Sequence, residues 1–143
     1  MKKRLCILFA LLICLSAFGC GSKGKTDGPI LFAVDPDSVT PEGLTYRIKG
    51  TPDAEGWMFG EDFVLEQQAQ GGWTAVPLLD PDMNYAFNAV GIPVFPGQSR
   101  EYELGWAWLY DTLPAGQYRL GKRFSGPGEK PVTLWAEFEI PSP

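Results

Sequence analysis

The side chains that could support chemistry are mainly carboxylates, because the chain has no histidine and its three cysteines lie within the first twenty residues. Two carboxyl groups can hydrolyse a bond when one is protonated and its neighbour is ionised. Glu101 with Glu103, and Glu137 with Glu139, each share one face of a predicted strand. Nothing near either pair predicts a pocket that would raise one pKa. We therefore interpret both pairs as solvated strand surface, assign no catalytic residue and expect no enzyme.

A second candidate is a short acidic loop. Asp80, Asp82 and Asn84 have the spacing of the first ligands of a helix-loop-helix calcium site. The sixth position of that motif is Tyr85 instead of glycine, and the twelfth is Gly91 instead of glutamate. We prefer a turn in which the aspartates accept hydrogen bonds from local backbone amides. Binding of a cation here is left open, and no metal site or cofactor is assigned.

The first twenty residues have the pattern of an export signal. Basic residues at 2–4 precede an apolar run over 5–15, which is shorter than a membrane-spanning helix requires, and small residues follow. Gly19-Cys20 at its end resembles the lipobox of bacterial lipoproteins. The resemblance implies a signal peptide over residues 1–19 and a diacylglyceryl group on the Cys20 thiol. It also implies a chain that is lipid-anchored at the extracytoplasmic face of the cell membrane.

Removal of the leader limits the remaining chemistry. Cys6 and Cys14 leave with it, so no disulfide and no free thiol would remain in the other 124 residues. The leader also holds three of the twelve basic residues and none of the seventeen acidic ones, so the net charge changes from −5 to −8. An acidic chain without a basic run is a poor partner for nucleic acid. The length suits one domain with its own core.

Strand-like alternation dominates the rest of the chain. Residues 20–29 are small and polar and predict a flexible tether, which leaves 30–143 as the folded domain. Apolar and polar residues then alternate with period two, and 17 glycines and 13 prolines leave little room for long helices. About seven to eight short strands predict an all-β, antiparallel two-sheet sandwich, with a small closed barrel as the alternative. The strands are expected at residues 30–34, 44–49, 63–65, 73–76, 85–89, 102–108, 117–120 and 132–140.

Several segments resemble a bacterial immunoglobulin-like domain family found on exported lipoproteins and on the ectodomains of membrane proteins: residues 46–48, 59–66, 72–73, 95–97, 100–102, 113–120 and 136–140. The resemblance covers roughly residues 39–140. It implies an immunoglobulin-like β-sandwich without catalytic residues, and it implies a tyrosine corner at Tyr118. The cysteine pair of antibody domains is absent, and either Trp73 or Trp106 could fill the central core position.

Aromatic residues expected at the surface are the candidate binding residues. Trp135 occupies a position at which the alternation of its strand predicts a solvent-facing residue. Trp57 and Phe59 lie in a glycine-flanked stretch between two strands. Exposed aromatic rings suit the binding of sugars, peptides or another domain, and core packing is the alternative for each. Trp106 and Trp108 share the face of apolar neighbours and are assigned to the interior.

Three functions follow from these features. We prefer a membrane-anchored module whose Ig-like domain binds an envelope or extracellular protein or another ligand. The alternative is an inhibitor of a secreted hydrolase that inserts a rigid loop over 88–98, with Pro93 and Pro96. An envelope enzyme is the least favoured, because histidine and a free thiol are both absent.

Overall fold

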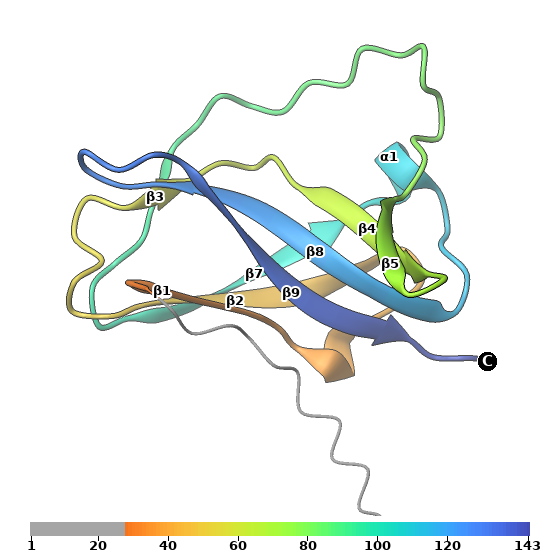
Figure 1. Ribbon diagram of the computed structural model, residues 1–143, viewed down its shortest axis with the longest axis horizontal. Coiled ribbons are helices and arrows are strands. Elements are labelled where there is room, and N and C mark those ends of the chain that lie inside the picture. Colours follow the sequence, from red (N-terminus) through yellow and green to blue (C-terminus); the bar gives the residue numbers. More distant parts are fainter. Residues whose placement is uncertain (1–27) are drawn as a thin grey trace, which may run out of the picture.

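The computed structural model describes residues 28–143. The predicted leader, Cys20 and nearly all of the tether lie outside the described residues. The described chain forms nine strands, one short 3-10 turn and one single-turn helix. All strand pairs are antiparallel, and the strands form two sheets that pack face to face (Figure 1). The predicted all-β sandwich is confirmed. Between residues 28 and 143 no helix has the length and apolarity to span a bilayer.

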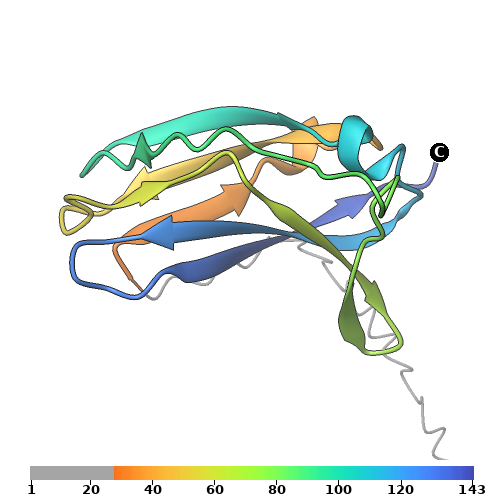
Figure 2. The same ribbon diagram turned by 90° about the horizontal axis from the view of Figure 1, so that it is seen from above.

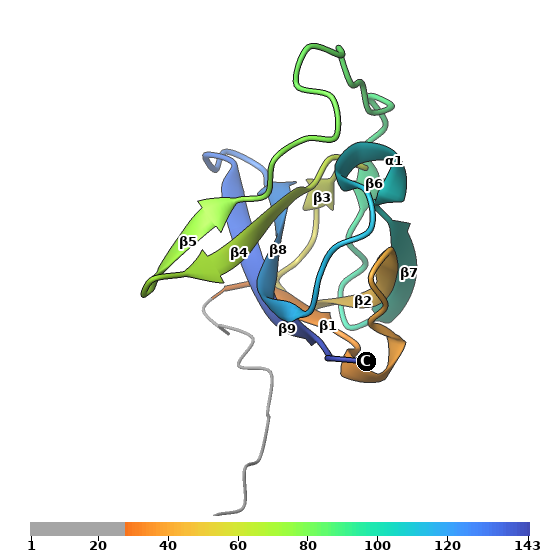
Figure 3. The ribbon, with the colours of Figure 1, turned by 90° about the vertical axis from the view of Figure 1, so that its right-hand side faces the viewer.

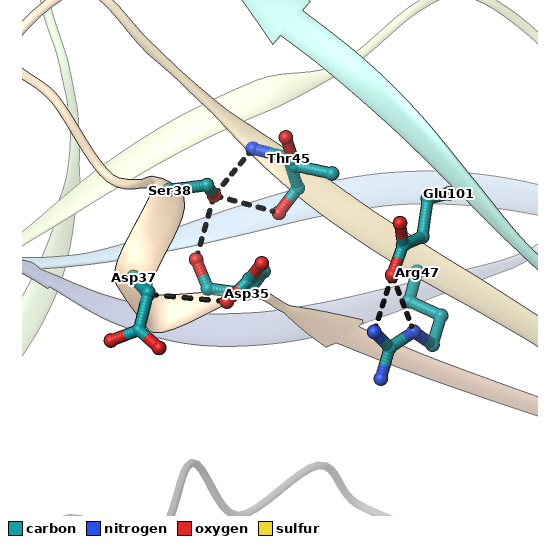
Figure 4. Close-up of polar contacts among 6 residues, drawn as sticks. All are labelled: Asp35, Asp37, Ser38, Thr45, Arg47 and Glu101. Carbon is teal, nitrogen blue, oxygen red and sulfur yellow. Dashed lines mark hydrogen bonds and ion pairs between the residues drawn. The ribbon is translucent and has the colours of Figure 1, made fainter.

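The smaller sheet has three strands, in the order β1-β2-β7. They are β1 (Ile30–Val34), β2 (Gly43–Gly50) and β7 (Ser99–Gly105). The predicted alternation in β2 holds, because Leu44, Tyr46 and Ile48 are all buried. On the opposite face Arg47 of β2 forms an ion pair with Glu101 of β7 (Figure 4). This face of the sheet is therefore the solvated one.

The turn that connects β1 to β2 is held by side-chain to backbone hydrogen bonds (Figure 4). The Asp35 carboxylate accepts from the backbone N–H of Asp37 (3.1 Å). The Ser38 hydroxyl accepts from the Thr45 N–H (2.7 Å) and donates to the Asp35 carbonyl (2.7 Å). These bonds cap the 3-10 turn η1 (Pro36–Ser38) and join it to Thr45 of β2.

Neighbouring strands of the larger sheet follow the order β5-β4-β8-β3-β6. β9 also pairs with β8, along the edge that β3 and β4 leave free. The central strand of this sheet is therefore β8, the longest of the nine. Figure 3 shows β8 and β9 on one side of the sandwich, with β2 and β7 on the other. The strands are β3 (Met58–Phe59), β4 (Val64–Ala69), β5 (Gly72–Ala75), β6 (Ile92–Pro93), β8 (Gly116–Ser125) and β9 (Val132–Ile140).

The core between the sheets contains the tyrosine corner implied by the Ig-like resemblance and one of the two candidate central tryptophans. Trp106 is completely buried, and its indole N–H donates to the Pro41 carbonyl (3.0 Å). Trp73 is only half-buried in β5, so Trp106 is the central tryptophan. The Tyr118 hydroxyl donates to the Pro114 carbonyl (2.8 Å), which confirms the tyrosine corner.

Two strand predictions are wrong. The expected strand at 85–89 is irregular, and the short pairing of β3 with β6 occurs instead. Two-residue strands are too short to give a periodic signal. The strand expected to run to residue 108 ends at Gly105, and the helix α1 (Ala107–Tyr110) follows. This turn of helix removes Trp108 from the strand's alternation and leaves it 49% exposed, so its assignment to the interior is wrong.

Candidate functional site

A groove of about 570 Å³ opens along the free edge of β7. The opposite wall is the segment that leads from the long β5–β6 connection into β6. Seen from above, this segment runs along the length of β7 (Figure 2). The residues that line the groove are Tyr46, Glu61, Phe63, Phe87, Ile92, Glu101, Tyr102, Glu103, Leu104, Gly105 and Trp108.

The wall formed by β7 presents unpaired backbone groups. Within residues 28–143, β7 pairs with β2 alone. The Trp106 N–H donates to the Glu42 carbonyl (2.9 Å), which fixes the phase of the ladder at this end of the strand. In an antiparallel pair, alternate residues direct their N–H and C=O groups to opposite edges. Glu101, Glu103 and Gly105 therefore direct theirs into the groove, in agreement with their place in its lining.

Aromatic rings from five parts of the chain form the floor and one end of the groove. Tyr46 of β2 and Tyr102 of β7 stack with their ring centroids 5.4 Å apart. Phe87 packs edge-on against Phe63 (5.5 Å) and against Trp108 of α1 (5.6 Å). The groove therefore offers apolar ring faces to a bound segment.

The rim of the groove carries negative charge. The Glu61 carboxylate accepts from the Asn88 side-chain amide (2.8 Å), which joins the β3–β4 connection to the long loop. Glu101 is partly neutralised by Arg47 on the solvated face of the sheet. Glu103 has no ion-pair partner in the described part of the chain. A cationic ligand suits this rim better than an anionic one.

A buried lysine lies beside the groove floor, in the core. Lys122 of β8 is 1% exposed, and its ammonium group donates to the Gly60 carbonyl (2.7 Å). The same nitrogen lies 5.4 Å from the ring centroids of both Tyr46 and Phe59. Burial lowers the pKa of Lys122 to about 8, opposed in part by the carboxylates at residues 61–62. This group is an internal cation held by one carbonyl and two ring faces.

The three aromatic residues proposed from the sequence lie in separate places. Phe59 is only 3% exposed and belongs to the core, so its selection as a binding residue is wrong. Trp57 is half-buried against Gly126 and lines a different hollow of about 670 Å³ near the start of the domain. Trp135 lies on the outer face of the larger sheet, 4.1 Å from the Arg119 guanidinium. The structure therefore does not join them into one site.

The acidic loop forms the local turn that we preferred. The Asp80 carboxylate accepts from the Asp82 N–H (3.0 Å), and the Asp80 N–H donates to the Tyr85 hydroxyl (3.1 Å). Across residues 28–143, no three or more cysteine, aspartate or glutamate side chains converge in a way that could hold a metal ion. The candidate calcium ligands instead shape the long β5–β6 connection.

The proline-rich loop proposed for an inhibitor of a secreted hydrolase is partly tied to neighbouring strands. Within residues 88–98, Pro93 belongs to β6, and Pro96 forms a bridge to the last residue of β2. Exposed apolar side chains occur both in this loop, where Val90 is 57% exposed, and earlier in the connection, where Leu79 is 54% and Met83 is 55% exposed. The pairing of Pro93 and Pro96 with neighbouring strands restricts the loop, and its use as an inhibitor of a secreted hydrolase stays a prediction.

Sequence reasoning did not select the groove residues. Period-two alternation assigns a residue to a face of its sheet and contains no information on which strand is at an edge. The alternation of glutamates with Tyr102 and Leu104 is a usable signal only after β7 is known to be an edge strand. Phe87 and Trp108 come together because the long connection returns across α1.

Comparison with known proteins identifies the family of this chain. None of the curated proteins matches this chain. Residues 30–139 match the family model of the bacterial Ig-like domain. The match runs from the first residue of β1 to the next-to-last residue of β9, and the observed sandwich has the fold that this match implies. The chain therefore belongs to the bacterial Ig-like domain family.

Proposed function

We propose that this protein is an exported lipoprotein, anchored through a diacylated Cys20 at the extracytoplasmic face of the cell membrane. Its Ig-like domain would bind an envelope or extracellular protein without transforming it. Family membership supports an extracellular binding module. The basic and apolar leader before Gly19-Cys20 supports export and lipidation. The lack of histidine supports binding over catalysis.

The observation that carries the proposal is the position of the exposed aromatic and apolar surface relative to the tether. Ile30, the first residue of β1, pairs with Gly50 at one end of β2. Gly105, which directly precedes the turn into α1, pairs with Gly43 at the other end. The two ends are seven residues apart, or about 23 Å. A chain anchored ahead of Ile30 would therefore hold α1 and the adjoining loop at the end away from the lipid (Figure 1).

The exposed surface at that distal end is tied together by specific contacts. Leu79, Met83 and Trp108 are each about half exposed. The Leu79 N–H donates to the Leu109 carbonyl of α1 (2.9 Å), and Tyr85 packs against Trp108 with a centroid distance of 5.9 Å. Exposed large apolar side chains on one loop and the adjacent helix are typical of a protein-binding surface.

Photo-cross-linking in the native membrane tests this proposal. A photoreactive amino acid replaces Leu79 in one variant, and Glu137, on the exposed face of β9, in the matched control. We expect a discrete cross-linked protein from the Leu79 position and none from Glu137, with mass spectrometry giving its identity. Equal cross-linking from both positions would contradict the proposed surface. Recovery of the chain in the cytosol with its leader intact would contradict the anchor.

A further inference from the structure

The sandwich is open on one side, where the two sheets end. β7 is the last strand of the smaller sheet, and β6 is the last strand of the larger one. In the described part of the chain these two strands do not pair with each other, and both line the groove that separates them. An unpaired strand edge is a template for the addition of another strand.

We propose that this groove binds an extended segment of a partner protein as an added strand on β7, and that the segment alternates apolar with basic residues. The inference rests on the proposed binding function and names its surface and the chemistry of its partner. Recognition of this type obtains affinity from main-chain hydrogen bonds and specificity from alternate side chains.

The backbone supplies the first part of the argument. The N–H and C=O groups of Glu101 and Glu103 and the N–H of Gly105 point into the groove and have no strand partner within residues 28–143. The Gly105 carbonyl accepts from the Trp108 indole N–H (3.1 Å). From Glu101 to Gly105 the strand rises about 13 Å, which is the length of four residues of an extended peptide. The edge therefore offers main-chain donors and acceptors at Glu101 and Glu103 and a donor at Gly105.

The alternation of β7 determines the side chains of the added strand. Residues directly opposite each other on neighbouring strands project from the same face of the sheet. Segment residues opposite Tyr102 and Leu104 would project inward, toward the ring of Phe87, and would have to be apolar. Segment residues opposite Glu101 and Glu103 would project outward beside those carboxylates. Lysine or arginine at these positions completes the charge pairing.

The same charges disfavour a second copy of this chain as the added strand. Pairing of two β7 edges would place Glu101 and Glu103 of one copy beside the same residues of the other, and like charges on neighbouring strands are destabilising. Charged residues on an edge strand also prevent unspecific strand pairing. The charge without an ion-pair partner on β7 is negative. It therefore disfavours the addition of an acidic strand and favours a basic one.

Titration of the full chain in detergent micelles with blocked seven-residue peptides tests the inference. The first peptide alternates valine with lysine, and the control alternates valine with glutamate. We expect the lysine peptide alone to shift the NMR signals of the Glu101, Glu103 and Gly105 amides and to slow their hydrogen exchange. We also expect its binding to weaken as salt rises, because exposed charge pairs are screened.

Two substitutions of Glu103 distinguish the contribution of the backbone to peptide binding from that of the charge. Glu103→Gln keeps the edge and removes the charge, and we expect about two- to fivefold weaker binding at low salt. Glu103→Pro removes an edge N–H that the ladder with β2 does not use, and we expect about tenfold weaker binding. Glu137→Gln, the same charge change on β9, should leave binding unchanged. If Glu103→Pro does not fold, a lysine peptide N-methylated at alternate residues replaces it, and its failure to bind is the expected result.

Three results would overturn the inference: equal binding of the glutamate peptide, signal shifts that map outside the groove, or no slowing of exchange at Glu101 and Glu103. Protection of these amides without peptide, together with dimers in sedimentation, would assign the edge to a second copy. If Leu79 still cross-links one discrete protein and Glu103→Pro captures it normally, the binding function stands and the groove inference fails. Loss of both the cross-link and peptide binding would reject the proposed binding function and the groove inference together.

Discussion

Replacement of the buried lysine by methionine should make the domain more stable at neutral pH. Lys122 is 1% exposed, and burial lowers its pKa from 10.5 to about 8. That depression corresponds to about 3 kcal/mol of penalty for carrying the charge in the folded state. Lys122→Met removes the penalty and also removes the hydrogen bond to the Gly60 carbonyl (2.7 Å), a loss of about 1.5 kcal/mol. We expect a net gain of about 1–2 kcal/mol at pH 7.

The dependence of stability on pH gives the sharper test. Below pH 8 the lysine is charged in both states, and the full penalty is present. Between pH 8 and 10.5 the unfolded chain keeps a proton that the folded chain has released, so the free energy of unfolding rises with pH. Burial raises the pKa of Tyr46, Tyr110 and Tyr118, so stability falls again once these groups ionise in the unfolded chain above about pH 10.

Urea unfolding followed by tryptophan fluorescence measures this effect in the wild type and in Lys122→Met. The wild type should gain about 2 kcal/mol relative to the variant between pH 7 and pH 9.5, because the tyrosines contribute equally to both. Lys49→Met, at an exposed position of β2, is the matched control, and its free energy of unfolding should depend on pH as that of the wild type does. If the free energy of unfolding of Lys122→Met and of the wild type changed equally with pH, the lowered pKa of Lys122 would be refuted. A methionine variant much less stable than the wild type at pH 7 would refute the penalty for burial.

Three further outcomes follow from the structure. Tyr118→Phe removes the hydroxyl that donates to Pro114 (2.8 Å), and urea unfolding should show a loss of about 1 kcal/mol. Gly121→Ala places a methyl group 2.6 Å from the Trp135 ring, which should destabilise the domain by about 1–3 kcal/mol. In a Trp135→Ala background the same change should lose at least half of that effect, and a double-mutant cycle checks it. Cys20→Ser should move the protein from the membrane to the soluble fraction with its melting temperature unchanged, as fractionation and calorimetry would show.

Local chemistry was sufficient for much of the fold. The strands at 30–34 and 132–140 have the bounds that the sequence predicts, because the first is a short apolar run that ends at a proline turn and the second alternates along most of its length. Tyr118 was recognised for a similar reason, since its hydrogen bond partner lies only four residues away. The sequence likewise predicts the turn at Asp80, because its hydrogen bond acceptor and donor are two residues apart.

The candidate site required the tertiary structure. Trp108 follows the alternation of a strand in the sequence, and only the turn into α1 exposes it. Phe59 lies among glycines in the sequence, and only its packing against Phe124 in the core buries it. Lys122 lies on the same inward-facing side of β8 as Tyr118. Its burial depends on a hydrogen bond to a carbonyl 62 residues away in the sequence.

The sequence by itself determined the all-β class, most of the strands, the tyrosine corner and the expectation of a lipid-anchored leader. Those features depend on the order of neighbouring residues, and alternation or a short motif is enough to reveal them. The tertiary structure alone decided that β7 is an edge strand, that its unpaired backbone faces aromatic rings and that a lysine is enclosed beside them. Strand order and burial arise from contacts between distant parts of the chain, and an alternating pattern carries no record of which strands are neighbours.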